Sequence, residues 1–98
     1  MSIHRTAAKR DANEAEIIEA LKVVGCSVQQ LSGIGVPDLL VCREGFLHLL
    51  EVKTAKGKLT PEQIEWHEAW NGPVYIVRTV EEAYRAIGIL WTKENSNL

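Results

Sequence analysis

Three charged residues, Asp38, Glu51 and Lys53, are the positions in this sequence at which we expect chemistry. Glu51 and Lys53 end a largely apolar run that begins at Phe46, and residues two apart in a strand project to the same face. Asp38 begins a second apolar run, so antiparallel pairing of the two runs would bring all three side chains together. Charges in this position indicate a functional site rather than ordinary strand surface.

A divalent cation is the partner that such a cluster needs. Two neighbouring carboxylates repel each other unless a cation lies between them. Mg²⁺ binds carboxylate oxygens, keeps several waters and accepts a phosphate as a further ligand, which suits phosphodiester hydrolysis. We therefore predict a Mg²⁺ site, in which Mn²⁺ would substitute, with the carbonyl of Val52 as a further ligand and no organic cofactor. Lys53 would orient the attacking water or stabilise the charge of the transition state.

A helix is predicted from residue 11 to residue 24, with Asp11 as its N-cap and Gly25 as its stop. Its apolar residues recur at helical spacing, at Ile17, Ile18, Leu21 and Val24. Glu14 precedes Ile17 by three residues, so its carboxylate points with the apolar face. One carboxylate of this helix is therefore expected inside the domain.

Two apolar runs, residues 38–42 and 46–53, predict a hairpin that turns at residues 43–45. A shorter extended piece at 26–31 precedes them and is the least defined strand. Pro37 fixes a backbone angle directly before Asp38 and would hold the approach to that aspartate in a defined path.

The second half of the sequence predicts a helix, a strand and a helix. Thr60-Pro61-Glu62-Gln63 has the pattern of a capping box that opens a helix to about Trp70. Residues 74–77 read as a strand, and Thr79 opens a last helix by the same capping logic. A strand, helix and strand in this order form a parallel crossover. We therefore predict an α/β fold with a mixed central sheet of three to four strands flanked by helices.

These motifs resemble a known family. The stretch Gly35-Val36-Pro37-Asp38-Leu39-Leu40-Val41 followed by Glu51-Val52-Lys53-Thr54 is similar to the core motif of PD-(D/E)xK nucleases. The continuation Gly57-Lys58-Leu59-Thr60-Pro61-Glu62-Gln63 resembles the virus-type replication-repair nuclease (VRR-NUC) branch, whose stand-alone members are similar to Holliday-junction resolvases. The resemblance covers roughly residues 14–88.

The resemblance implies a restriction-endonuclease-like core and a divalent-metal endonuclease. It implies metal ligation by Glu14, Asp38 and Glu51, and catalytic roles for Asp38, Glu51, Lys53 and Gln63. Two of these residues also have a simpler, purely structural interpretation. Glu14 also fits a first-turn acid that stabilises the helix dipole, and Gln63 also fits the third residue of a capping box.

The aromatic and histidine residues have structural interpretations. Trp66 and Trp70 lie four residues apart, which is more typical of a helix core than of a platform for nucleic-acid bases. No pair of the three histidines has metal-ligand spacing, and His48 is expected to pack on the same face as Val52. Cys26 and Cys42 lack CxxC spacing and read as reduced core thiols.

The charge balance argues against strong autonomous binding of nucleic acid. The net charge is −2 and the pI is about 5.9, whereas proteins that bind a phosphate backbone usually carry a basic excess. Local groups of basic residues could still bind phosphates, and the candidates are Lys9, Arg10, Lys56 and Lys58. All four also fit ordinary solvated charges.

The 98-residue length predicts one domain at residues 11–91, between a flexible basic arm at 1–10 and a frayed tail at 92–98. No run of apolar residues approaches membrane length and no signal peptide is evident, so we expect a cytoplasmic, intracellular protein without membrane contact. A phage-encoded protein is one alternative for its origin.

The leading hypothesis is a structure-selective DNA endonuclease acting on branched DNA such as four-way (Holliday) junctions. A nuclease for flap, nicked or RNA substrates is an alternative within the same chemistry, and a non-catalytic nucleic-acid-binding module is an alternative outside it. We expect a homodimer, because a short chain of net charge −2 offers few phosphate contacts by itself. Trp91 is the candidate residue for its interface.

Overall fold

The computed structural model describes residues 10–90 of the chain. Its seven elements have the predicted order and are α1 (Glu14–Val23), β1 (Ser27–Gln30), β2 (Leu39–Arg43), β3 (Phe46–Val52), α2 (Pro61–Ala69), β4 (Tyr75–Val77) and α3 (Val80–Ala86). The extended piece at 26–31 is a true strand. Of the predicted arm at 1–10 only Arg10 is described, and the predicted tail at 92–98 lies outside the described residues.

The four strands form one mixed sheet in the order β1-β2-β3-β4. β1, β2 and β3 pair antiparallel, and β4 pairs parallel to β3 after the crossover through α2. The hairpin between β2 and β3 closes with a loop of two residues, Glu44 and Gly45, whose φ angles are 54° and 87°. Positive φ at both positions is what a type I′ turn requires, and glycine adopts it without strain. The predicted α/β architecture is confirmed.

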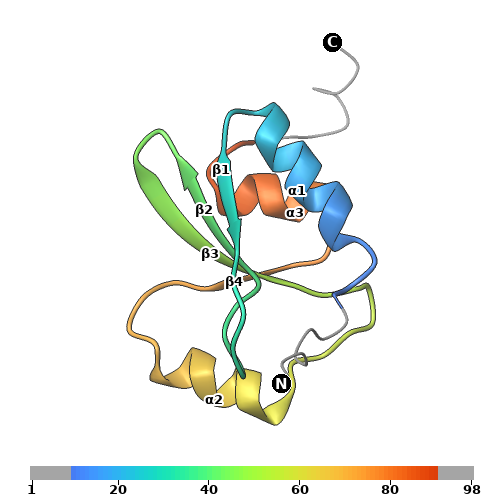
Figure 1. The fold of residues 1–98 in the computed structure, drawn as a ribbon, viewed down its shortest axis with the longest axis vertical. Coiled ribbons are helices and arrows are strands. Elements are labelled where there is room, and N and C mark those ends of the chain that lie inside the picture. Colours follow the sequence, from blue (N-terminus) through green and yellow to red (C-terminus); the bar gives the residue numbers. More distant parts are fainter. Residues whose placement is uncertain (1–9, 91–98) are drawn as a thin grey trace, which may run out of the picture.

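Two helices cover one face of the sheet, as Figure 1 shows for α1 and α3. The buried core lies between them and the strands and consists of Ile17, Leu21, Cys26, Leu39, Val41, Leu50, Val52, Val77, Ala83 and Ile87. Because side chains alternate along a strand, Val52 points into this core while its neighbours Glu51 and Lys53 point to the other face. The core therefore fixes the side of the sheet on which the charged residues emerge.

The helix α2 lies at one end of the sheet, apart from α1 and α3 (Figure 1), and has no buried residue. The predicted capping box at its start is present, with Thr60 and Gln63 bonded reciprocally. The prediction that Trp66 and Trp70 belong to a helix core is wrong. Trp66 is half-buried, Trp70 is 45% exposed, and their rings stack on each other at 4.8 Å.

The start of α1 also differs from the prediction. Its N-cap position is Asn13, with no side-chain capping bond, so Asp11 is not the N-cap. Asp11 contributes its backbone carbonyl, which accepts a hydrogen bond from the Glu14 N–H at 3.0 Å. Gly25 ends the helix region with φ of 92°, as expected. At α3, Thr79 caps the Glu82 N–H, but the Glu82 carboxylate accepts from Arg78 rather than from Thr79, so only half of a capping box forms.

Both cysteines are free, with Cys26 buried and Cys42 half-buried. Within residues 10–90 there is no helix with the length and apolar character needed to span a membrane.

Candidate active site

Asp38, Glu51 and Lys53 meet where β2 begins and β3 ends. Leu39 pairs with Leu50, so Asp38, directly before β2, lies opposite Glu51 in the continued register. The Asp38 carboxylate accepts a hydrogen bond from the Val52 N–H at 2.7 Å, which ties the loop before β2 to the end of β3. The sequence predicted this convergence from the hairpin alone, and the structure brings the three residues together.

Gln63 bridges Glu51 and Lys53. Its Nε2 donates to Glu51 Oε2 at 3.1 Å, and its Oε1 accepts from Lys53 Nζ at 2.8 Å. The same Oε1 also accepts from the Thr60 N–H at 2.9 Å, so Gln63 makes its capping contact and its contacts with Glu51 and Lys53 at the same time. Lys53 Nζ lies 3.7 Å from Glu51 Oε2. The first turn of α2 therefore fixes the relative positions of a carboxyl and an ammonium.

Burial dominates the electrostatics of Glu51, which is 1% exposed. Burial, the charge of Asp38 and a hydrogen bond with Asp38 together raise its pKa to about 8, against the opposing effect of the Lys53 charge. Without a metal ion, Glu51 therefore holds a proton at neutral pH. Its Oε1 is buried and has no hydrogen-bond partner within the described part of the chain.

Glu14 is the second buried carboxylate and is 2% exposed. Its Oε2 accepts from Gln30 Nε2 at 2.9 Å and from Arg10 Nη1 at 3.1 Å. Burial raises the pKa of Glu14, and the contacts with Gln30 and Arg10 oppose that rise. The expected inward direction of Glu14 is confirmed, and Arg10 connects it to Asp38, whose Oδ1 lies 3.5 Å from Arg10 Nη1.

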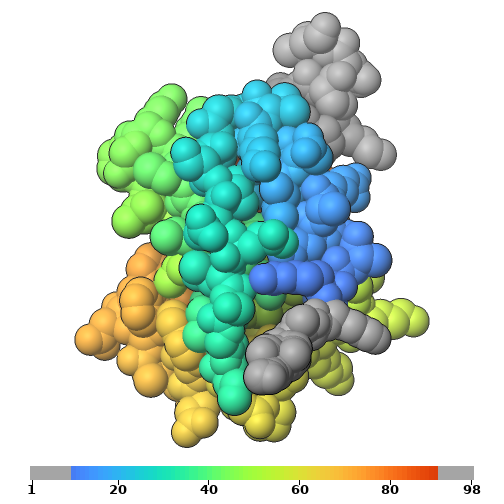
Figure 2. Space-filling view, viewed as in Figure 1, coloured from blue at the N-terminus to red at the C-terminus, as the bar shows by residue number. Residues whose placement is uncertain are grey.

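The predicted basic residues fall in different places. Arg10 lies within the acidic cluster, and the start of the described chain, dark blue in Figure 2, lies against the teal chain of β1 and the loop after it. Lys56 and Lys58 are exposed in the loop between β3 and α2. Lys9 lies outside the described residues.

Two positioning residues, Asn13 and Arg78, were not found from the sequence. Asn13 Nδ2 donates to the carbonyls of Lys53 and Arg78, both at 3.0 Å. Arg78 Nη1 donates to the carbonyls of Thr54 and Gly57, both at 2.7 Å. They hold the end of β3 and the loop after it, and their partners are too distant in sequence for a local pattern to indicate them.

His67 is a third residue, which the sequence analysis rejected as a metal ligand and did not place in the site. Its Nε2 lies 3.8 Å from Glu51 Oε1, and both atoms are buried with no hydrogen-bond partner in the range 10–90. Burial lowers the pKa of His67, and the charge of Lys53 lowers it further, so the imidazole is neutral at neutral pH. Its spacing of four residues from Gln63 places both on one helix face and could have indicated it.

The donor set fits a divalent cation, although the side chains are not arranged around one. Among residues 10–90, no three His, Cys, Asp or Glu side chains form a group that could hold a metal ion. One oxygen of each carboxylate has another partner: Val52 for Asp38, Gln63 and Lys53 for Glu51, and Arg10 and Gln30 for Glu14. Glu51 Oε1 is buried and has no hydrogen-bond partner among residues 10–90, and the charge of Asp38 contributes to the raised pKa of Glu51. A cation would satisfy this oxygen and relieve that repulsion.

Comparison with known proteins finds a solved structure with a similar fold. No family model matches the chain, and no curated protein matches it. Among solved structures, a chain described as "VRR_NUC domain" is similar with a TM-score of 0.63 and 26% sequence identity, over 79% of this chain and 96% of that chain. The match therefore supports a nuclease domain of the VRR-NUC family, with the restriction-endonuclease-like α/β fold that the motif predicts.

Proposed function

We propose that this chain is a divalent-metal-dependent DNA endonuclease that hydrolyses phosphodiester bonds in branched DNA such as four-way junctions. The observation that carries the proposal is the cluster of Asp38, Glu51, Lys53 and Gln63 at the end of β3. Glu51 is buried beside a second carboxylate and an ammonium, at a cost in desolvation that packing alone does not require.

Each side chain has a role that follows from its contacts. Asp38, Glu51 and Glu14 would hold Mg²⁺ or Mn²⁺, with the Val52 carbonyl as a further ligand, and a bound cation supplies Lewis-acid activation of the phosphate. Lys53 would stabilise the negative charge that develops on the phosphate oxygens, because Gln63 already fixes its ammonium beside Glu51. Water attacks the phosphorus atom, and the bond from phosphorus to one sugar oxygen breaks.

DNA binding would use the loop between β3 and α2. Lys56 and Lys58 are exposed there, and Arg78 fixes this loop through the carbonyls of Thr54 and Gly57. A fixed loop presents its cations to a phosphate backbone at a smaller entropic cost than a flexible one. Arg10 would add a contact on the side of α1.

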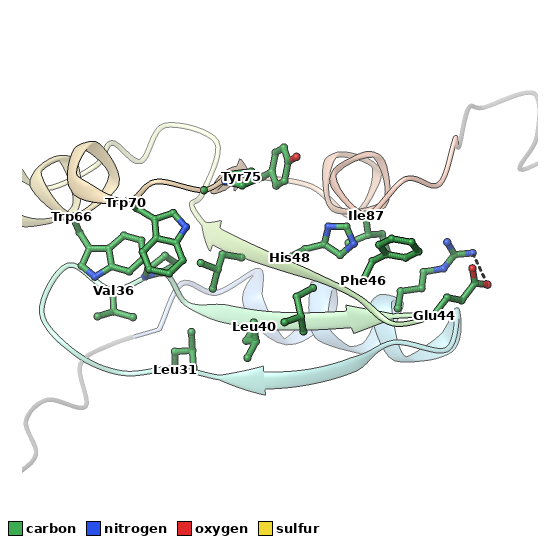
Figure 3. Close-up of a pocket in the computed structure, with 16 residues that line it drawn as sticks. Leu31, Val36, Leu40, Glu44, Phe46, His48, Trp66, Trp70, Tyr75 and Ile87 are labelled. Carbon is green, nitrogen blue, oxygen red and sulfur yellow. Dashed lines mark ion pairs between the residues drawn. The ribbon is translucent and has the colours of Figure 1, made fainter.

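We also propose a homodimer, for which an apolar groove of about 680 Å³ is the candidate interface. Figure 3 shows Trp66 and Trp70 together at one end of this groove and His48, Phe46 and Ile87 toward the other. Four consecutive residues of β3, Phe46 to Leu49, line it. Because alternate residues of a strand point to opposite faces, consecutive residues share a cavity only along a strand edge.

The edge of β3 in this groove has no strand partner among the described residues, since β4 begins opposite Leu50. The N–H of Lys53 donates to Val77 of β4, so by alternation the N–H groups of Leu49 and Leu47 point to the same, open side. A second copy could add its own β3 antiparallel across a two-fold axis. The exposed Glu62, Glu65 and Glu68 of α2 repel phosphates and favour a protein over DNA at this groove. Trp91, the predicted interface residue, lies outside the described residues.

The experiment that tests the function is cleavage of labelled four-way junction, flap, nicked duplex, linear duplex, single-stranded DNA and RNA with Mg²⁺, Mn²⁺ or EDTA. We expect cutting of the junction, loss of cutting in EDTA, and a loss of about 100-fold or more in Asp38→Asn, Glu51→Gln and Lys53→Ala. Glu19→Gln, an exposed carboxylate on α1, is the matched control. Near-normal cleavage by any of the three site variants at saturating Mg²⁺ contradicts the site, and cleavage of flaps or RNA in preference to junctions contradicts the substrate.

A further inference from the structure

Arg10 has the contacts of an internal counter-ion rather than those of a free DNA-binding residue. Its guanidinium contacts three segments: Glu14 Oε2 in α1 at 3.1 Å, Asp38 Oδ1 before β2 at 3.5 Å, and the Leu31 carbonyl after β1 at 2.8 Å. The Arg10 side chain is 37% exposed, whereas that of Glu14 is 3% exposed. The guanidinium therefore covers the solvent side of a buried carboxylate.

The two cations of the site divide the acidic groups between them. Lys53 contacts Glu51 and Gln63, on the α2 side. Arg10 contacts Glu14 and Asp38, on the α1 side. Of these two cations, Lys53 is the more enclosed, at 12% exposure of its side chain, and Arg10 is the one that can move into solvent.

A metal ion and Arg10 would need the same oxygens. Glu14 Oε2 already accepts from both Arg10 and Gln30, and a divalent cation bound to Glu14 and Asp38 would place a second positive charge against the guanidinium. The two positive charges would repel each other, so a bound cation weakens the ion pairs of Arg10 with both carboxylates. A released guanidinium, still next to the site, has the planar, two-pronged donor geometry that binds phosphate.

We propose that Arg10 competes with the divalent cation for Glu14 and Asp38, and that it transfers to a substrate phosphate once the cation is bound. This inference rests on the proposed metal-dependent function. It gives the residue two partners in turn: carboxylates in the metal-free protein and a phosphate in the metal-bound protein.

The first test is isothermal titration of Mn²⁺ into the wild-type chain, Arg10→Gln and Lys22→Gln. Lys22 is exposed at the end of α1, so its substitution changes the net charge equally without touching a carboxylate of the site. We expect Arg10→Gln to bind Mn²⁺ about five-fold more tightly than wild type, and Lys22→Gln to differ by less than about two-fold. Equal or weaker binding by Arg10→Gln overturns the competition, whereas no Mn²⁺ binding by the wild-type chain overturns the proposed function as well.

The second test measures binding of labelled duplex by fluorescence anisotropy in the Lys53→Ala background, with Mg²⁺ or with EDTA. We expect Arg10→Gln to weaken binding by about five-fold in Mg²⁺ and by less than about two-fold in EDTA, because only the metal-bound state releases the guanidinium. An equal loss in both conditions means that Arg10 binds phosphate regardless of the metal and overturns the transfer.

Discussion

Glu51 combines near-complete burial with a neighbouring carboxylate and a neighbouring ammonium, and this combination makes the metal-free protein sensitive to pH. Its pKa rises from an ordinary value of 4.5 to about 8 in the folded chain. The folded state therefore binds a proton more tightly than the unfolded state does. The stability that this contributes is fully present below about pH 4.5 and is lost as the pH rises through about 8.

We predict that Glu51→Gln removes much of this pH dependence. In EDTA, raising the pH from 5 to 8.5 should lower the melting temperature of the wild-type chain more than that of Glu51→Gln. At pH 8.5 the Glu51→Gln variant should be the more stable of the two. A difference of 1 kcal/mol corresponds to about 4–8 °C in a domain of this size. Glu19→Gln, an exposed carboxylate on α1, is the control. Parallel profiles of the wild type and Glu51→Gln would show that Glu51 titrates normally.

Glu14 and Asp38 should differ in their importance for cleavage. Glu14 already has Gln30 and Arg10 as partners, whereas Asp38 lies opposite Glu51 and accepts from the backbone of Val52. We predict that Glu14→Gln lowers the cleavage rate by about 10-fold and Asp38→Asn by about 100-fold or more. Single-turnover rates at saturating Mg²⁺ measure both losses. An equal or greater loss in Glu14→Gln would reverse this ranking.

How far the sequence predicts single residues depends on how local their causes are. Asp38, Glu51 and Lys53 could be placed because strand alternation and a short hairpin determine where they meet. Asn13 and Arg78 could not be placed. The partners of Asn13 lie 40 and 65 residues away along the chain, those of Arg78 lie 24 and 21 residues away, and no periodicity connects them. The N-cap of α1 was missed for the same reason: Asn13 takes that position, but its side chain bonds to the residues directly after β3 and β4 rather than to its own helix.

At the scale of elements, the contact that positions α2 is made by the loop before β2. Gly35 has φ of 79°, and a Cβ atom there would lie 2.5 Å from the Glu62 carbonyl oxygen and 3.3 Å from Trp66 Cβ. The loop that carries Asp38 therefore packs directly on the first turn of the helix that carries Gln63. Because α2 has no buried residue, its position depends strongly on this contact between Gly35 and the first turn of the helix.

We predict that Gly35→Ala lowers both stability and activity. The positive φ alone should cost about 1–2 kcal/mol, and the clash with Glu62 should push α2 and Gln63 away from Glu51 and Lys53. Gly25→Ala is a matched control, because Gly25 has φ of 92° and its Cβ would meet nothing within 4 Å. Urea unfolding and cleavage rates measure the two effects. We expect both variants to lose stability and only Gly35→Ala to lose more than about 10-fold in rate.

Element types and order followed from the sequence, but the place of α2 did not. Its capping box, Thr60 to Gln63, is a local signal and forms as predicted. Trp66 and Trp70 have the spacing of a core stripe, yet the core that they were expected to enter is already filled by α1 and α3 on the other face of the sheet. Helical spacing identifies which residues share a face, whereas only the packing of the whole domain decides what that face contacts.

At the scale of the whole molecule, the open edge of β3 is the feature that a monomer leaves unexplained. Natural proteins protect exposed edges with charged residues, prolines or bulges, and Phe46 to Leu49 has no charged residue and no proline. Phe46 and Leu47 are 70% and 67% exposed. A two-fold partner would cover both residues and pair the free N–H groups, and it would place two active sites in one particle, as the two-fold symmetry of a four-way junction requires.

We predict that the chain is a dimer in solution and that Leu47→Glu makes it a monomer of 11.0 kDa. A charge at the open edge costs little in a monomer, because Leu47 is exposed there, but it would be buried without a partner in the dimer. Val23→Glu is the matched control, since Val23 is 80% exposed on α1, away from the groove. Light scattering at micromolar concentration, with and without junction DNA, measures the mass of each.

We expect Leu47→Glu to lose its preference for junctions while keeping weak cleavage of linear duplex, and Val23→Glu to behave as wild type. A wild-type chain that is monomeric in both conditions and cuts junctions no better than linear duplex would end the dimeric, junction-selective proposal and leave the nuclease site standing.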